Sequence, residues 1–281
     1  ERAILLIVGD INAQTLIPQI SEQFSDWKGR GQPGGDPKPV MVKPPSPDVA
    51  MLVTAGAPDT AVTLRWFEPY QERAPTKAEV RKNLIEQLGA GIVARRMQGI
   101  NEAAGKPAAF IGSASPSAIT HVWNGEMASS GRVTDVAKTI DVMVKAHRQA
   151  VEFGVTQEEL DRQISLRLDA SKREAERGRT GTSVSLVETA LDYIDADVPF
   201  VSLQQSYALL LEQVPTITLA EVNAALKARF TDKPMLTYRG SEAPKGGEAG
   251  LRSAFAAAMA APISAYKPDA VKPWPYTDFG K

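Results

Sequence analysis

The sequence contains no cysteine and only two histidines among its 281 residues. The absence of cysteine excludes disulfides, thiolate metal sites and a cysteine nucleophile. A zinc site usually needs three protein ligands. Neither His121 nor His147 has a second histidine or an acidic residue at ligand spacing, since Glu152 follows His147 by five residues. We therefore expect both histidines to be core or interface residues, and this chain to have no catalytic and no metal-binding residues.

Long apolar runs and an excess of charge of one sign are also missing. No run approaches the roughly 20 apolar residues of a membrane span. The 32 basic and 33 acidic residues give a formal net charge of −1, which is not the signature of a protein that binds nucleic acid or an anionic membrane. Hydrophobic residues make up 43% of the chain, enough for a sizeable core. We therefore expect a globular protein with no membrane span and no nucleic-acid partner.

Hydrophobic periodicity predicts an α+β fold. Strands are predicted at residues 4–8, 60–67, 108–115, 119–130 and 235–239, the first as a continuous apolar run buried on both faces. Helices are predicted at residues 12–24, 76–99, 134–153, 183–195, 202–212 and 218–230, and from residue 156 onward. Hairpin strands beside helical crossovers indicate a mixed, largely antiparallel sheet with helices packed on one face.

Side chains at helix ends support these boundaries. A Thr followed three residues later by Glu is a capping box, and the sequence has three: Thr76/Glu79, Thr156/Glu159 and Thr218/Glu221. Gly154 is predicted to end the preceding helix in a left-handed conformation. Residues 1–240 are expected to form a single domain. Residues 241–281 are expected to form a short helix and a Pro-rich linker to a following domain, so the chain is expected to be a piece of a longer protein.

Two further patterns receive structural interpretations. Residues 89–94 match a loose dinucleotide-binding fingerprint, but a helix precedes them where that fingerprint needs a strand, so we expect small residues in a closely packed helix. The charged stretch at 172–179 has mixed sign and is interpreted as a solvated helix end, with a peptide-contacting basic edge as the alternative. No nucleophile-elbow pattern marks a serine.

Several segments, taken in order, resemble the pitrilysin/insulinase family of zinc peptidases. They are the opening strand with Val8-Gly9-Asp10-Ile11, the helix ending Phe24-Ser25-Asp26-Trp27, residues 88–97, residues 102–115, the turn Gly154-Val155-Thr156-Gln157-Glu158-Glu159-Leu160, residues 217–222 with the strand at 235–238, and the tail at 272–280. The resemblance implies a mixed sheet flanked by helices, duplicated in tandem. In such proteins one repeat carries the zinc motif His-x-x-Glu-His, and a companion repeat lacks it.

Because this chain has no His-x-x-Glu-His, the resemblance identifies it as a non-catalytic, C-terminal-type repeat from a long bacterial member. The resemblance implies that the parent is a zinc metalloendopeptidase whose zinc lies in its catalytic domain, and that this repeat helps to form a chamber for peptides and is inactive alone. Some companion repeats supply a Tyr and an Arg to the substrate carbonyl. Here Phe110 takes the place of the Tyr and residues 103–104 are both Ala. Since Phe has no hydroxyl to stabilise an oxyanion, we expect no direct catalytic assistance.

The resemblance places substrate binding at Phe110, Ile111, Gly112 and Ser113. This predicted strand mixes small residues, which let a peptide backbone approach, with one aromatic side chain. The alternative is that Phe110 fills the core. The expected partners are a peptide substrate and the zinc-bearing repeat, in the same parent chain or in a partner subunit. The sequence does not fix the compartment, and the resemblance suggests the periplasm because long bacterial members are often exported.

Two other functions stay open at this point. One is a non-peptidase assembly subunit of the same fold, like the core subunits of respiratory complexes. The other is an independent enzyme, for which no constellation of residues speaks.

Overall fold

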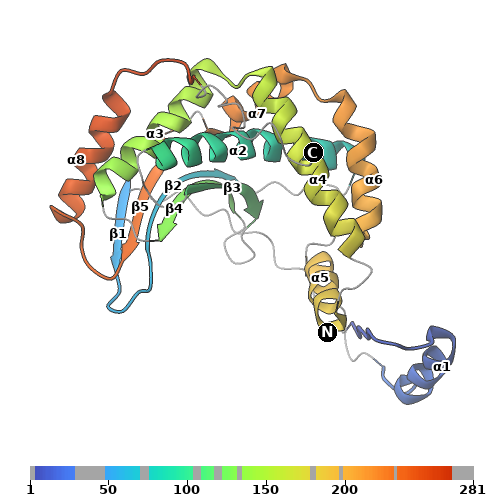
Figure 1. The fold of residues 1–281 in the computed structure, drawn as a ribbon. Coiled ribbons are helices and arrows are strands. Elements are labelled where there is room, and N and C mark those ends of the chain that lie inside the picture. The colour runs from blue at the N-terminus through green and yellow to red at the C-terminus, as the bar shows by residue number, and fades with distance from the viewer. Residues whose placement is uncertain are drawn as a thin grey trace, which may run out of the picture.

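The computed structural model describes residues 4–28, 48–69, 76–103, 109–116, 122–131, 135–177, 182–195, 199–230 and 233–267. In chain order the elements are α1 (Ala13–Phe24), β1 (Val49–Val53), β2 (Thr60–Pro69), α2 (Lys77–Ala103), β3 (Ala109–Pro116), β4 (Val122–Gly131), α3 (Val136–Phe153), α4 (Gln157–Arg177), α5 (Ser183–Asp195), α6 (Leu203–Gln213), the short 3-10 helix η2 (Val214–Thr216), α7 (Leu219–Phe230), β5 (Met235–Gly240) and α8 (Gly247–Ala260). Helices α2, α3, α7 and α8 cover one face of the sheet (Figure 1).

The sheet has the strand order β1-β5-β2-β4-β3. The predicted hairpin is confirmed as β3 and β4, which are antiparallel, and β4 continues the ladder along the whole of β2, from Thr60 opposite Gly131 to Pro69 opposite Val122. β5 runs antiparallel to β2, and only β1 is parallel to its neighbour, β5. The predicted class, a largely antiparallel mixed sheet with helices on one face, is confirmed. Strand β1 was missing from the predicted elements.

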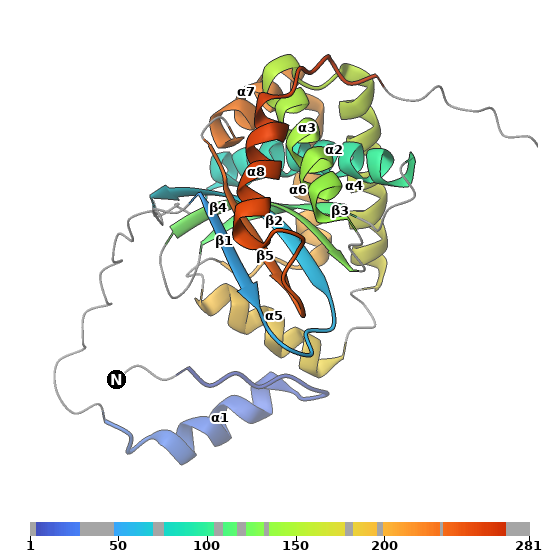
Figure 2. The ribbon, with the colours of Figure 1, turned by 90° about the vertical axis from the view of Figure 1, so that its left-hand side faces the viewer.

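The predicted buried strand at residues 4–8 is wrong. These residues form no strand, and the side chains of Ile4 and Leu5 are 68% and 57% exposed. The helix that follows, α1, begins at the Asn12 cap as predicted, but it has no buried residue. Both lie away from the sheet and its helices (Figure 2). An apolar run reports a need for burial, and the part of the chain described here offers this run no strand to pair with.

The core forms between the sheet and α2, which lies across its covered face. The predicted stripe of α2 is buried at Leu84, Leu88 and Ile92, whereas Val80 at its start is 44% exposed. On the sheet side, Val62, Leu64 and Trp66 of β2 alternate inward, as period two requires, and all three are buried. The long helix is therefore held between strands on one side and the other helices on the other.

Two glycines allow α2 to approach its neighbouring helices closely. A Cβ atom at Gly89 would lie 2.8 Å from Cγ of Leu226 in α7, and one at Gly91 would lie 2.2 Å from Nε2 of Gln163 in α4. Both glycines lie inside α2, with no strand before them. The prediction that residues 89–94 are small for close packing, and not a dinucleotide-binding turn, is confirmed.

Gly89→Ala should destabilise the fold, whereas Gly99→Ala in the same helix should not. Alanine favours a helix by up to about 1 kcal/mol over glycine, but at position 89 its methyl group would press on Leu226, which is buried, at an overpacking cost of roughly 1–3 kcal/mol. A Cβ at Gly99 would meet only the hydroxyl of Tyr266, at 3.7 Å. Urea unfolding of the two variants measures the difference, and equal stabilities would contradict the close packing of α2 on α7.

Candidate functional site

The predicted substrate-binding residues lie in β3, which is an edge strand of the sheet. Phe110, Ile111 and Gly112 pair with Ala128, Met127 and Glu126 of β4. In the strand order, β3 is the last member and has a neighbour on one side only. No other described strand lies along its outer edge, so backbone groups on that side are open to pairing with an added strand. β3 also lies against the central helix α2.

A β-bulge interrupts this edge within the predicted segment. Gly112 pairs with Glu126, but the next pair joins Ser115 to Asn124, so Ser113 and Ala114 together face one residue of β4. The alternation of side chains therefore reverses after Gly112. A strand added along β3 would find a regular ladder over residues 109–112, and Ser113 lies in the bulge.

The structure places the two histidines differently. His121 lies outside the described residues. His147, in α3, is buried, with Nε2 2.6 Å from the carbonyl oxygen of Phe230 and its ring 4.8 Å from the ring of Trp66. Burial lowers the pKa of His147 to about 4, partly offset by the hydrogen bond to Phe230. The imidazole is therefore neutral at pH 7, donates from Nε2 to the carbonyl, and is a core residue as predicted.

The structure should lose stability in acid through His147. Because its folded pKa of about 4 lies below the ordinary 6.5, the unfolded chain binds the extra proton between those pH values. The stabilisation is present above pH 6.5 and decreases as the pH falls to 4, by roughly 3 kcal/mol. In His147→Leu, which should still fold, the free energy of unfolding should fall less between pH 7 and 4 than in the wild type. The same fall in both proteins would show that His147 is not buried as a neutral group.

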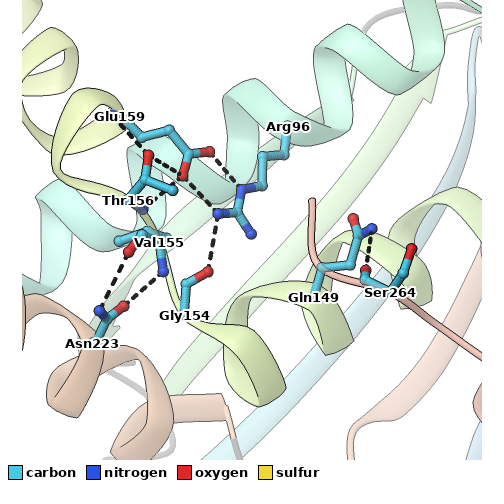
Figure 3. Close-up of polar contacts among 8 residues, drawn as sticks. All are labelled: Arg96, Gln149, Gly154, Val155, Thr156, Glu159, Asn223 and Ser264. Carbon is cyan, nitrogen blue, oxygen red and sulfur yellow. Dashed lines mark hydrogen bonds and ion pairs between the residues drawn. The ribbon is translucent and has the colours of Figure 1, made fainter. Parts of the chain in front are cut away.

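A buried ion pair joins α2 to the start of α4 (Figure 3). The guanidinium of Arg96, whose side chain is 2% exposed, binds the Glu159 carboxylate at two points, Nε to Oε1 at 2.6 Å and Nη2 to Oε2 at 2.7 Å. Nη2 also donates to the carbonyl oxygen of Gly154 at 3.0 Å. Burial raises the pKa of Glu159, but Arg96 and Thr156 together bring it below its ordinary value. The carboxylate is therefore ionised at neutral pH and matched by a fixed cation.

The turn that resembled the peptidase family is the junction of three helices. Gly154 has φ 76° and ψ −172°, so the predicted positive φ is confirmed, although ψ is extended where a left-handed helical cap was expected. The backbone N–H of Val155 donates to Oδ1 of Asn223 in α7 at 2.8 Å. Thr156 and Glu159 form the predicted capping box at the start of α4. The motif therefore positions α3, α4 and α7 against one another.

Helix α2 holds the start of α7 in the same way. Thr218 and Glu221 form the predicted capping box of α7, and Glu221 also binds Arg81 of α2 at 2.8 Å. Arg81 and the capping Thr218 lower the pKa of Glu221 to about 2. The two ion pairs differ in burial, because the side chains of Arg81 and Glu221 are 29% and 39% exposed. Helix α2 thus supplies one arginine to each of two helix N-termini.

Glu159→Gln should cost far more stability than Glu221→Gln. Glutamine preserves both capping boxes, so each substitution removes mainly a carboxylate charge. At position 159 it leaves the buried Arg96 cation unpaired, a loss of about 3 kcal/mol or more, whereas Arg81 keeps access to solvent and the second loss should be much smaller. Thermal unfolding of the two variants compares them. Similar losses would mean that the Arg96 pair is no more important than an exposed one.

The segment after α8 covers this ion pair. Gln149 Nε2 donates to the carbonyl oxygen of Ser264 at 2.9 Å, and Arg148 donates to that of Ala261. The guanidinium of Arg96 lies 4.7 Å from the centre of the Tyr266 ring. Residues 261–267 therefore run across α3 to α2 and help to exclude water from Arg96. The charged end of α4, at residues 172–177, is exposed except for Ala175, as predicted for a solvated helix end.

Within the described ranges, no group of three or more His, Asp or Glu side chains is placed to hold a metal ion. A comparison with models of protein families matches residues 1–166 to the peptidase M16 inactive domain. The chain belongs to this family. The resemblance found in the sequence is thereby confirmed, since the matching structures below are insulinase-type proteases. No curated protein sequence matches the chain.

Solved structures of bacterial proteases share the fold of this M16 inactive domain. A predicted insulinase family protease from Yersinia pestis matches with a TM-score of 0.74 and 16% identity, over 90% of this chain and 54% of that one. The first half of the periplasmic protease PqqL from Escherichia coli matches with a TM-score of 0.75 and 12% identity, over 92% and 56%. In the structure of PqqL the match has a TM-score of 0.72 and 13% identity, and covers 96% of this chain and 30% of that one. The chain thus spans a third to about half of the length of these structures.

Sequence reasoning missed Arg96, Arg81 and Asn223, which connect the helices. The only signal for Arg96 is its place in a run of apolar residues of α2, directly before Met97, where an arginine must be paired to be buried. Asn223 carries no signal, because an amide in an amphipathic helix is ordinary.

Proposed function

We propose that this M16 inactive domain forms part of the wall of a peptide-binding chamber in a zinc-dependent metallopeptidase, and that it has no peptidase activity alone. The observation that carries the proposal is the open edge of β3 in a chain of the inactive-domain family. An edge strand binds an extended peptide through main-chain hydrogen bonds, whatever the peptide's sequence. Such binding suits a wall that presents many substrates to a separate catalytic centre.

The chemistry supports a division of labour between two repeats. Hydrolysis by zinc needs three fixed protein ligands and a general base beside the bound water. The described residues do not fit a zinc ion, because His147 lies in the core with its Nε2 bound to a backbone carbonyl. The zinc therefore belongs to a companion repeat, in the same parent chain or in a partner subunit.

The regular part of the β3 edge limits how much peptide this wall holds. Only residues 109–112 precede the bulge, so the added ladder spans about four residues before its register changes. Gly112, at the end of this ladder, has no side chain to obstruct the approaching backbone. The bulge also protects the edge from pairing with another protein's strand along its whole length.

We place the parent in the periplasm. One structural neighbour is a periplasmic protease. No helix in the described part of the chain is long and apolar enough to cross a membrane.

Phe110→Ala in the parent enzyme should raise KM for peptides several-fold and leave the melting temperature nearly unchanged. This follows if Phe110 adds an apolar contact to the β3 edge. If Phe110 instead fills the core, the same change should cost roughly 3–5 kcal/mol of stability and leave KM unaltered. Phe153→Ala, at a half-exposed position of α3, is the matched control and should change neither quantity.

The alternative function, a non-peptidase assembly subunit, makes a different prediction for the same preparation. A parent protein that forms a stoichiometric complex but shows no chelator-sensitive peptide cleavage would be an assembly subunit, and the chamber proposal would fail.

A further inference from the structure

Helix α5 stands apart from the core although its sequence is apolar. It lies at the far end of the antiparallel pair α4 and α6, on the side of the sheet away from the other helices (Figures 1 and 2). None of its described residues is buried. Exposed large apolar side chains gather on α5 and the segment after it; we name them the α5 surface, which consists of Val184, Leu186, Leu191, Ile194 and Phe200.

The α5 surface is larger than isolated exposure accounts for. Helical spacing places Val184, Leu191 and Ile194 on one face of α5, at 66%, 47% and 36% exposed. Phe200 extends that surface, because its ring lies 5.3 Å from the ring of Tyr193 in α5. Single exposed apolar residues are ordinary, but a cluster marks an interaction site. A helix of this length is also marginal in water without packing, so α5 needs a covering surface.

The charges around α5 are of one sign. Between Arg179 and Lys227 the sequence has six acidic residues and no Lys, Arg or His, in a chain whose net charge is −1. Glu188 and Asp192 are exposed and lie at positions i and i+4 of α5. Like charges at that spacing destabilise a helix by a few tenths of a kcal/mol. A partner with Lys or Arg around an apolar patch would relieve the repulsion and cover the apolar side chains together.

A second unpacked part of the chain lies on the same side as α5. Residues 4–24 expose Ile4, Leu5 and Ile17, and α1 has no buried residue. Both views draw this segment beyond α5, away from the helices that cover the sheet (Figures 1 and 2). One covering body would therefore meet both parts, which is the size of a domain interface and exceeds that of a short peptide. The structures of the same fold are also longer than this chain, which spans 54% of one and 56% of another.

We infer that the α5 surface is the interface through which this domain binds the zinc-bearing companion repeat, by means of an apolar patch bordered by Lys and Arg on that repeat. The inference rests on the proposed function, because it takes the companion repeat from it. It assigns separate roles to two surfaces: the β3 edge receives peptide, and the α5 surface holds the catalytic repeat.

Hydrogen–deuterium exchange on the parent protein and on the isolated chain tests the interface. Amides of residues 183–195 should exchange about tenfold or more slowly in the parent than in the chain alone, while core amides of β2 and α3 exchange alike in both. In the parent, Leu191→Asp and Asp192→Lys should abolish this slowing. The matched controls on α4 are Leu166→Asp, at an apolar residue 38% exposed, and Asp169→Lys, at an exposed acidic residue, and they should retain it.

Three outcomes would overturn the inference. They are equal exchange of α5 in the parent and the chain, slowing that survives Leu191→Asp, and slowing in the isolated chain that increases with its concentration, which would identify a second copy as the occupant. Peptide cleavage measured on the same samples separates the two proposals. A parent that protects α5 but cleaves no peptide contradicts the chamber proposal alone, and one that cleaves peptide with α5 unprotected contradicts this inference alone.

Discussion

The buried ion pair between Arg96 and Glu159 determines where the outer helices lie. It fixes α4 to the central helix α2, and α4 carries α6 beside it and α5 at its far end. A buried pair of this kind adds little net stability over apolar packing, but it tolerates one arrangement only, since any shift leaves a charge unpaired. The exposed pair of Arg81 and Glu221 repeats the device for α7 with less constraint.

This arrangement explains how a domain without a metal site can serve a peptidase. The capping-box turn at 154–160, which resembles the family's motif, carries no chemistry and holds three helices in register. The sheet is covered on one face and ends at β3, where backbone groups are open to an extended chain. Zinc chemistry then needs to be supplied once, by the companion repeat, while this repeat contributes shape and an edge.

Local signals in the sequence predicted much of the fold. The capping boxes at Thr156 and Thr218 and the hairpin of β3 and β4 depend on residues close in sequence, and all were found as expected. The parallel pairing of β1 with β5 was missed because it joins residues nearly the whole chain apart. The strand predicted at residues 4–8 was wrong because an apolar run does not reveal whether its partner lies in the same domain.

The site was less predictable than the fold for the same reason. The sequence marked residues 110–113 as a strand with small residues, but strand order decides that β3 lies at an edge, and strand order depends on distant contacts. The bulge at Ser113 and Ala114 arises from the register with β4 and has no signal in β3 itself. Arg96 could not be identified without its partner, because Glu159 is 63 residues away.

Reconstitution of peptide hydrolysis tests the central claim most directly. The rate of cleavage of an unstructured peptide would be measured for this chain alone, for the zinc-bearing repeat alone, and for the two together, with and without a metal chelator. The account predicts no cleavage by this chain, little by the zinc-bearing repeat, and chelator-sensitive cleavage by the mixture. Chelator-sensitive cleavage by this chain alone, or full activity of the zinc-bearing repeat without it, would contradict the account.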